Sequence, residues 1–190
     1  MLLILASNSP RRSAILTQLG IKFRVEPSLV KEDAAGRPPL DLPRFFAEEK
    51  AVDVSSRNGD ILTLGFDTLV FLDNRPLGKP KDKADAIRTL SELSGRTHQV
   101  ISGFAAARCG RLLASGSETT RVTFRTTAPK EIEAYVATGE PMDKAGSYAI
   151  QGLGARFIKS IDGCFYNVVG LPVSRTLDML ASLGERDVGL

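Results

Sequence analysis

A polar segment near the start of the chain carries residue types suited to binding an anion. The apolar run from Leu2 to Ala6 gives way to Ser7-Asn8-Ser9-Pro10-Arg11-Arg12 and then to an amphipathic stretch, which predicts a strand, a loop and a helix. Ser9 is a favoured N-cap residue and Pro10 suits the first helical turn, so backbone N–H groups and two guanidinium groups would converge there. Such a position suits phosphate. The same residues also fit a capped helix with two solvated arginines.

A second candidate for chemistry is Asp67, the acidic member of Gly65-Phe66-Asp67-Thr68. Apolar residues flank this motif over 61–64 and 69–72, so the pattern predicts a pair of strands that the motif interrupts. A carboxylate in such surroundings is costly to bury unless it meets a cation, a metal ion or a reacting water. The alternative is an aspartate at a strand end or bulge, where Gly65 relieves the backbone.

Basic side chains follow in a rigid turn, Gly78-Lys79-Pro80-Lys81. A lysine in such a turn is commonly just solvated. Beside an acidic pocket and the Arg11-Arg12 loop, however, Lys79 becomes a second phosphate contact.

Glycines are dense over residues 138–154, which implies backbone that turns tightly or approaches a ligand closely. Asp143, Lys144 and Gln151 supply hydrogen-bonding groups in this segment, and the Gln151 amide can read the edge of a base. The alternative is an irregular crossover whose polar residues satisfy each other.

Helical and strand periodicities alternate around these motifs. Helices are predicted over 13–19, 43–56, 84–93, 129–138 and 173–183, and further strands over 22–25, 99–107, 112–125, 147–150 and 155–161. Residues 31–42 are charged and proline-rich, which predicts a surface loop, and residues 73–76 predict a turn. The mixture indicates an α/β protein with a mixed sheet, organised as a single domain with two lobes.

Composition narrows the classes of partner. The chain has 190 residues and a formal net charge of +3, and no basic run is long enough to grip a nucleic-acid backbone, so a small polyanion is the expected partner. Cys109 and Cys164 form no CxxC pair, which favours reduced thiols. No apolar run approaches the ~20 residues of a membrane span. We therefore expect a cytoplasmic protein with no membrane partner.

Taken together, these segments resemble the Maf family of nucleoside triphosphate pyrophosphatases. The resemblance covers nearly the whole chain, and each motif alone is weak, whereas their order and spacing are specific. The motifs are Ser7 to Arg12, Glu32, Glu49-Lys50-Ala51, Gly65 to Thr68, Gly78-Lys79-Pro80, Gly139-Glu140-Pro141, Asp143 to Gly146, Ile150-Gln151-Gly152 and Asn167 to Pro172.

The resemblance implies a cytoplasmic, metal-dependent enzyme that hydrolyses a nucleoside triphosphate to the monophosphate and pyrophosphate. It also implies an elongated α/β fold of the inosine triphosphatase type, with a mixed sheet flanked by helices, two lobes around a deep cleft, and a homodimer. The Asp-Lys-Ala-Gly and Ile-Gln-Gly forms resemble the branch that acts on dTTP and UTP. Phe66 departs from the small residue that is usual at its position, and its ring can reshape the pocket beside Asp67.

By the same resemblance, Asp67 is the proton acceptor, and substrate preference is set by Arg12, Thr68 and Gln151. The chemistry agrees, because attack of water on the α-phosphorus needs a base near neutral pH, which a carboxylate near a divalent cation provides. Glu32 and Asp67 are the expected ligands of Mg²⁺, Mn²⁺ or Co²⁺. The expected phosphate contacts are Ser7, Arg11, Lys50 and Lys79.

Two other functions stay open at this point. The same pocket would serve a non-catalytic nucleotide-binding protein that regulates cell division, although such a protein has no need for Asp67 together with a metal-binding acid. A pyrophosphatase for N7-methyl-GTP is the other alternative. His98, which enters a predicted strand and is the only histidine of the chain, is interpreted as structural rather than catalytic.

Overall fold

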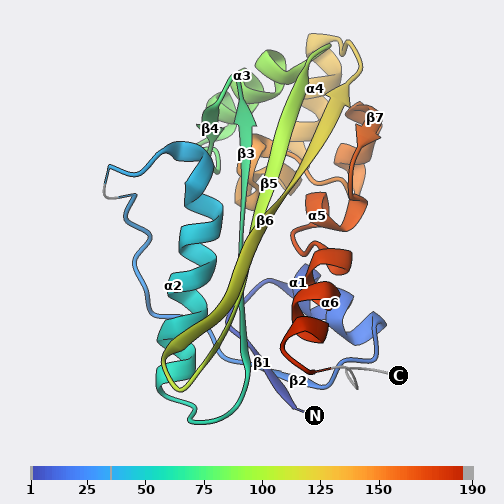
Figure 1. Cartoon of the computed structure of the whole chain (residues 1–190). Helices are drawn as coiled ribbons and strands as arrows, with labels where there is room; N and C mark the ends of the chain where they lie inside the picture. Colours follow the sequence, from blue (N-terminus) through green and yellow to red (C-terminus); the bar gives the residue numbers. More distant parts are fainter. Residues whose placement is uncertain (1, 35, 186–190) are drawn as a thin grey trace. The chain divides into compact units, whose positions relative to one another are not determined.

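The computed structural model describes residues 2–34 and 36–185 (Figure 1). Seven strands form one mixed sheet in the order β2-β1-β3-β5-β6-β7, with β4 paired to β3. β1 runs parallel to β2 and β3, whereas the pairs β3–β4 and β6–β7 are antiparallel. The strands are β1 (Leu3–Leu5), β2 (Phe23–Val25), β3 (Thr63–Leu72), β4 (Arg75–Leu77), β5 (Thr97–Arg108), β6 (Arg111–Phe124) and β7 (Ile158–Asp162). The helices are α1 (Pro10–Gln18), α2 (Leu42–Ser56), α3 (Lys83–Leu93), α4 (Pro129–Ala137), α5 (Phe165–Val169) and α6 (Val173–Ser182). The expected mixed sheet with flanking helices is confirmed.

The chain divides into two compact units, each assembled from separate segments. Unit 1 contains Met1–Asp67, Ser102–Glu118 and Gly170–Leu190, and unit 2 contains Thr68–Ile101 and Thr119–Val169. One boundary falls directly after Asp67, within the motif that the sequence singled out. The expected cleft between two lobes stays a prediction.

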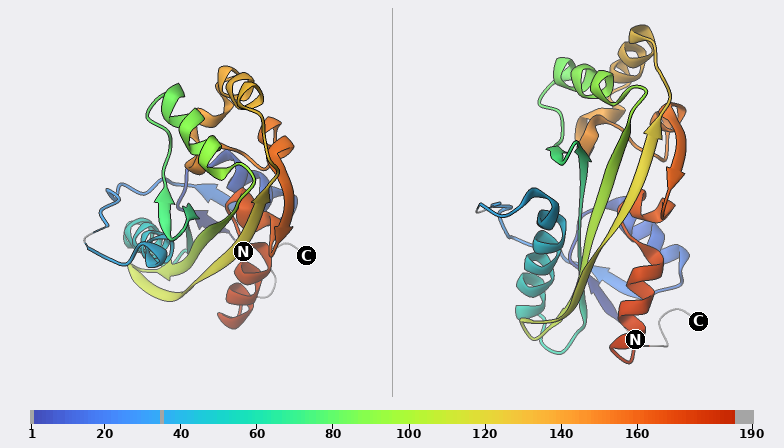
Figure 2. Two further views of the ribbon diagram at one scale, coloured as in Figure 1. Left: turned by 90° about the horizontal axis from the view of Figure 1, so that it is seen from above. Right: turned by 45° about the horizontal axis from the view of Figure 1, so that its top comes forward.

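In unit 1, α2 packs unusually close to the sheet because small residues line the contact. A Cβ atom on Gly65 of β3 would lie 2.2 Å from the Ala47 carbonyl oxygen, and one on Gly103 of β5 would lie 2.0 Å from the Pro43 carbonyl oxygen. Four buried alanines complete this contact, namely Ala47, Ala51, Ala105 and Ala107. Figure 2 shows α2 on one side of these strands and α1 and α6 on the other.

The core of unit 2 is rich in aromatic rings. Phe124 lies edge-to-face with Tyr148 and with His98, whose ring centroid is 5.0 Å away. His98 is 2% exposed, and its Nε2 lies 2.8 Å from the Tyr148 hydroxyl oxygen. Burial lowers the pKa of His98 to about 4. His98 is therefore a neutral core residue, in keeping with the structural role predicted for the only histidine of the chain.

The motif around Asp67 does not interrupt the sheet. β3 runs unbroken through Thr63–Leu72, with Gly65 to Thr68 in its middle. Gly65 serves the close approach of α2 rather than a bend, so the predicted strand pair is one long strand. The turn after it is shorter than predicted, because Asp73 and Asn74 alone adopt positive φ and Arg75 already belongs to β4.

Two further predictions of strands are wrong, and one helix, α5, was not predicted. Residues 147–150 are not a strand, because Gly146 and Ser147 have φ of 69° and 60°, which extended backbone cannot contain. The strand predicted at 155–161 begins only at Ile158, after a 3₁₀ turn over Leu153–Phe157. The short helix α5 carries too few residues for a helical period to be visible in the sequence.

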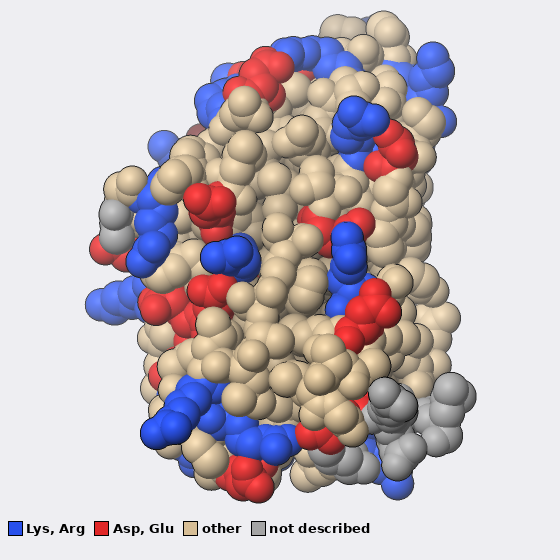
Figure 3. Space-filling view, viewed as in Figure 1, with Lys and Arg blue, Asp and Glu red and all other residues tan. Residues whose placement is uncertain are grey.

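Charges of both signs are interspersed over the face drawn in Figure 3. Along α2 and directly after it, ion pairs join residues one helical turn apart, as Arg44 does with Glu48 and Arg57 with Asp53. Among the described residues of this face, basic side chains occur in small groups rather than in one band (Figure 3). Within residues 2–34 and 36–185, no helix has the length and apolar character needed to cross a membrane.

Candidate active site

The centre of the candidate site is Lys50, whose ammonium group lies between two carboxylates of unit 1. Lys50 Nζ donates to Asp67 Oδ1 at 2.6 Å and to Glu32 Oε1 at 2.7 Å. Asp67 belongs to β3, Lys50 to α2, and Glu32 to the loop after β2. The Lys50 and Asp67 side chains are only 15% and 9% exposed, whereas Glu32 is 51% exposed. The structure therefore joins three residues that are far apart in the sequence.

The small residues under α2 explain why Lys50 reaches Asp67. Side chains alternate along a strand, so Gly65 and Asp67 face the same side of β3. A Cβ on Gly65 would lie 2.8 Å from the backbone nitrogen of Ala51, the residue after Lys50. Because Gly65 lacks that atom, α2 lies close enough for its lysine to contact Asp67.

The electrostatic state of Asp67 follows from two opposing effects. Burial raises the pKa of Asp67, while the charges of Lys50 and Arg12 lower it, and the net shift is upward. Oδ1 is bound to Lys50, but Oδ2 is buried without a hydrogen-bond partner among the described residues. A buried carboxylate oxygen in this state is suited to accept a proton from water or to bind a cation.

The loop that carries Glu32 is tied to α2 through side chains. The Asp53 carboxylate accepts from the Ser28 hydroxyl at 2.8 Å and from the Leu29 backbone N–H at 2.9 Å. Asn58 Nδ2, just beyond α2, donates to Glu26 Oε1 at 2.9 Å. The sequence predicted a surface loop at residues 31–42, and these contacts fix its approach to Lys50.

The segment after β1 forms the capped helix that the sequence predicted. Ser9 Oγ accepts from the Arg12 backbone N–H at 3.4 Å, and Pro10 begins α1. The Arg12 guanidinium donates from Nη1 to Ser7 Oγ at 2.9 Å and from Nε to the Gly170 carbonyl oxygen at 2.8 Å. Burial lowers the pKa of Arg12, and the charge of Asp67 raises it. Arg12 is partly exposed as a residue, but its charged end is enclosed by protein atoms.

Arg11, Arg12 and Lys50 place three cations in the part of unit 1 that contains Asp67. Arg11 is half-buried and acts on the pKa of Arg12 through its charge. Two acids, Asp67 and Glu32, oppose these charges. This mixture suits a polyanion with a bound cation better than a bare anion.

Two carboxylates could hold a divalent cation here. Asp67 Oδ2 lacks a partner in the described part of the chain, and Glu32 is exposed. Mg²⁺ needs only one or two protein carboxylates, since phosphate and water complete its shell, so Asp67 and Glu32 fit it. Residues 2–34 and 36–185 contain no cluster of three or more His, Cys, Asp or Glu side chains arranged for a metal.

The remaining predicted residues, Thr68, Lys79 and Gln151, belong to unit 2. Thr68 is half-buried in β3, while Lys79 and Gln151 are exposed. The turn of Lys79 is anchored where the Gly146 N–H donates to the Gly78 carbonyl oxygen at 3.1 Å. Their assigned roles in phosphate binding and base selection stay predictions.

Glu140 organises the turn after Gln151 and was not assigned a role from the sequence. Its carboxylate accepts from the backbone N–H groups of Leu153 and Gly154 at 3.0 and 2.9 Å, and from the Tyr135 hydroxyl at 3.0 Å. Burial acts to raise the pKa of Glu140, but these bonds lower it overall. The only signal for this role was the presence of an acid in a glycine-rich stretch, which also contains Asp143.

A family model described as Maf-like protein matches residues 2–183. The chain belongs to the Maf-like family. The resemblance drawn from the motifs is thereby confirmed. Maf-like relatives named dTTP/UTP pyrophosphatase include one from Aquifex aeolicus, which is 44% identical over 96% of this chain and 96% of its own length. One from Symbiobacterium thermophilum is 48% identical over 96% of this chain and 94% of its own length.

Among solved structures, a dITP/XTP pyrophosphatase from Mycobacterium abscessus covers 96% of this Maf-like chain and 97% of its own chain. Its TM-score is 0.46 at 14% identity. The strand order of the sheet, and not this similarity, is the basis of the fold.

Proposed function

We propose that this Maf-like protein hydrolyses dTTP and UTP to the nucleoside monophosphate and pyrophosphate, as a house-cleaning activity. The substrates are those in the names of relatives 44% and 48% identical over nearly the whole chain. The observation that carries the reaction is Asp67, a buried carboxylate with an upward pKa shift and a buried oxygen that lacks a partner among the described residues.

In the proposed reaction, Asp67 Oδ2 takes a proton from a water molecule. The water oxygen forms a bond to the α-phosphorus, and the bond from that phosphorus to the oxygen bridging to the β-phosphate breaks. The pair of electrons leaves with pyrophosphate. Lys50 holds the Asp67 carboxylate through Oδ1 and leaves Oδ2 for the water. Arg11 and Arg12 of unit 1 offset the negative charge that develops on the phosphates.

We propose that a divalent cation, Mg²⁺, Mn²⁺ or Co²⁺, is required. Asp67 and Glu32 would hold it, because both carboxylates face Lys50 and carry oxygens suited to a hard cation. When bound, such a cation neutralises phosphate charge and lowers the pKa of a coordinated water. Lys50 would keep its bond to Asp67 Oδ1 and would contact phosphate through another of its three N–H groups, which is the role predicted for it.

The remaining roles in the proposal rest on the matching motifs. Ser7 and Lys79 would contact phosphate, and Arg12, Thr68 and Gln151 would select the base. Ser7 Oγ accepts from Arg12 Nη1, so a phosphate contact by Ser7 would also orient this arginine. We further propose that the protein acts in the cytoplasm and as a homodimer, as the family resemblance implies.

The test is release of pyrophosphate by the purified protein from a panel of nucleoside triphosphates that includes dTTP, UTP and N7-methyl-GTP, with and without Mg²⁺. We expect the highest kcat/KM for dTTP and UTP, and loss of activity on chelation. Binding without pyrophosphate release would instead indicate a non-catalytic nucleotide-binding protein. Preference for N7-methyl-GTP would instead assign the protein to the branch of the family that acts on this nucleotide.

A further inference from the structure

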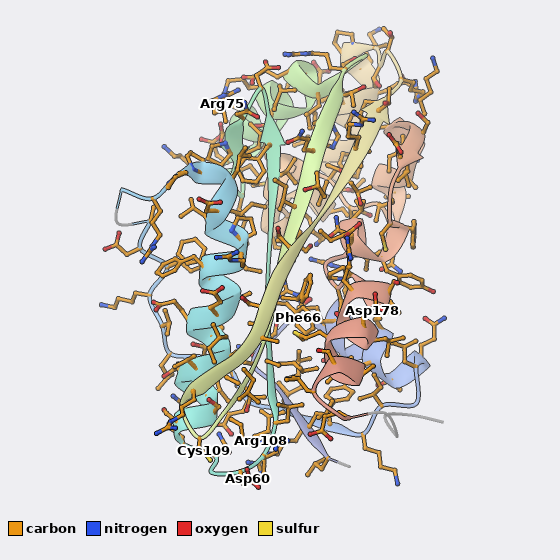
Figure 4. The ribbon with its side chains drawn as sticks, viewed as in Figure 1. Asp60, Phe66, Arg75, Arg108, Cys109 and Asp178 are labelled. Atoms are coloured by element: carbon orange, nitrogen blue, oxygen red, sulfur yellow. The ribbon has the colours of Figure 1, made fainter. Side chains whose placement is uncertain are left out.

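Phe66 lies under the guanidinium group of Arg12. Arg12 Cζ is 6.0 Å from the centroid of the Phe66 ring, at a separation where an aromatic face attracts a cation. The ring is fully buried, and Figure 4 shows it on the side of β3 away from α2. Consecutive residues of β3 therefore serve opposite faces, Asp67 toward Lys50 and Phe66 toward Arg12.

The other contacts of Arg12 show why a ring matters here. Its Nε donates to the Gly170 carbonyl oxygen at 2.8 Å and its Nη1 to Ser7 Oγ at 2.9 Å, and the charge of Asp67 also acts on this cation. Burial lowers the pKa of Arg12, which reflects a cation with little access to water. Under such conditions the negative face of an aromatic ring stabilises a cation more than it does in water.

We propose that Phe66 is a positioning residue that holds the plane of the Arg12 guanidinium for nucleotide binding. The proposal rests on the proposed function, since it treats Arg12 as a nucleotide contact. An arginine side chain has large rotamer freedom, and its usefulness in recognition depends on the orientation of its planar group. The hydrogen bonds from Nε and Nη1 hold two edges of that group, and the Phe66 ring limits its tilt. Phe66 thereby influences substrate affinity without touching the substrate.

The variant that isolates this role is Phe66→Leu, which keeps an apolar side chain and removes the aromatic face. Phe104→Leu is the matched control, because Phe104 is also buried in unit 1, on β5, and its substitution makes the same chemical change elsewhere. The first readout is the NMR signal of the Arg12 Nε–H group, identified by its loss in Arg12→Lys.

In the wild-type protein we expect this signal to be shifted by the ring and protected from hydrogen exchange. Phe66→Leu should remove the ring shift and speed exchange on the order of tenfold, while Phe104→Leu leaves both unchanged. An Arg12 signal that Phe66→Leu does not alter overturns the proposal. This readout needs neither substrate nor turnover.

The second readout is the Kd of a UTP analogue with a non-hydrolysable α,β-methylene bridge, alongside KM and kcat for UTP. Phe66→Leu should raise Kd and KM by about five- to thirtyfold, with kcat changed less than about twofold. In an Arg12→Ala background the same substitution should have no further effect on Kd. Equal losses in both backgrounds would show a general packing role and overturn the proposal.

The failure of the proposed function can be told apart from the failure of this inference. If the wild-type protein binds the analogue but releases no pyrophosphate, the proposed function is refuted, and the binding data still test the role of Phe66. A wild-type protein that does not bind the analogue overturns both.

Discussion

At the scale of single residues, Asp67 and Lys50 form a buried ion pair in which each charge depends on the other. Removing one partner of such a pair leaves an uncompensated charge in the interior, which costs far more than the pair contributes on balance. The exposed ion pairs of this chain behave differently, because water screens them. The pair therefore contributes to stability and to chemistry at once.

Lys50→Met should lower the free energy of unfolding by about 3 kcal/mol, because it strands the buried Asp67 carboxylate. The double variant Lys50→Met/Asp67→Asn should recover much of this loss, since the amide carries no charge. Chemical denaturation of the variants measures both values. Arg88→Met is the control, because Arg88 is 55% exposed and pairs on the surface of α3. A loss no larger than that of the control would mean that Asp67 is not charged in the folded protein.

Asp67→Asn should reduce kcat by about 10² to 10⁴, because the amide is nearly isosteric but cannot take a proton. Thermal unfolding should show that the fold is retained, since the amide oxygen of the variant can still accept from Lys50. Asp60→Asn is the matched control in the same unit, because the Asp60 side chain is 87% exposed. Steady-state pyrophosphate release measures the effect, and an unchanged kcat in folded Asp67→Asn would remove Asp67 from the mechanism.

Gln151→Ala should change selectivity rather than abolish turnover. If its amide pairs with a pyrimidine edge, its loss leaves the hydrogen-bonding groups of the correct base unpaired and narrows the difference among nucleotides. Values of kcat/KM for dTTP and UTP should fall more than those for purine nucleotides. A uniform fall across the panel would indicate that Gln151 supports the fold or the phosphates.

At the scale of elements, the position of α2 decides whether Lys50 can meet its two carboxylates. α2 lies against β3 and β5 through Gly65, Gly103 and the four alanines of the contact. Backbone atoms of the helix occupy the space that a Cβ on either glycine would need, so the strain of a larger residue cannot be relieved by a side-chain rotation. By fixing how closely α2 approaches the sheet, the contact sets the distance between Lys50 and Asp67.

Gly103→Ala should shift α2, because the new Cβ would lie 2.0 Å from the Pro43 carbonyl oxygen and 2.4 Å from the Arg44 nitrogen. We expect a loss of stability of about 1 to 3 kcal/mol together with a lower kcat, although Gly103 contacts no proposed substrate group. Gly78→Ala, which meets nothing within 4 Å, is the control for stability. A Gly103→Ala protein with wild-type stability and kcat would show that this contact does not set the distance between Lys50 and Asp67.

At the scale of the whole molecule, the predicted site residues are divided between the two compact units. Unit 1 contains Asp67, Lys50, Glu32 and the Ser7 to Arg12 segment, while unit 2 contains Thr68, Lys79 and Gln151. Each unit has its own buried contacts, with small residues under α2 in the first and aromatic rings around His98 in the second. Overall stability therefore depends on the core of unit 2 as well as on the candidate site.

The pH dependence of stability should report His98. Its pKa falls from 6.5 to about 4 on burial. The contribution of neutral His98 to the free energy of unfolding is therefore fully present above pH 6.5 and is lost as pH falls toward 4. The loss should reach about 2 kcal/mol by pH 5 and about 3 kcal/mol in all. His98→Gln keeps a polar group near Tyr148 without a proton to gain, so it should flatten this part of the profile. Equal profiles of unfolding free energy for both proteins would contradict the assignment.

The sequence by itself determined the family, the mixed α/β class and the ends of most helices. These features depend on local rules or on motif order: Ser9 and Pro10 begin α1 by capping chemistry, and the apolar periodicities of α2, α3 and α6 match their observed spans closely. Local rules failed where backbone conformation was unusual, as at Gly146 and Ser147, because residue types do not reveal a left-handed serine. The motif around Asp67 was misplaced for a related reason, since a glycine required by a distant helix looks like a break in a strand.

Only the tertiary structure decided which side chains meet. The phosphate contact expected of Lys50 stays a prediction, but only the structure shows that its ammonium lies between Glu32 and Asp67, because the glycines of two strands let α2 approach the sheet. Likewise, the Phe66 ring was expected beside Asp67, where it can reshape the pocket, yet it faces the other side of β3 and lies under Arg12. Such pairings depend on the packing distance between a helix and a sheet and on the face to which a strand residue points. Both are set by contacts among residues far apart in the chain, which no local pattern contains.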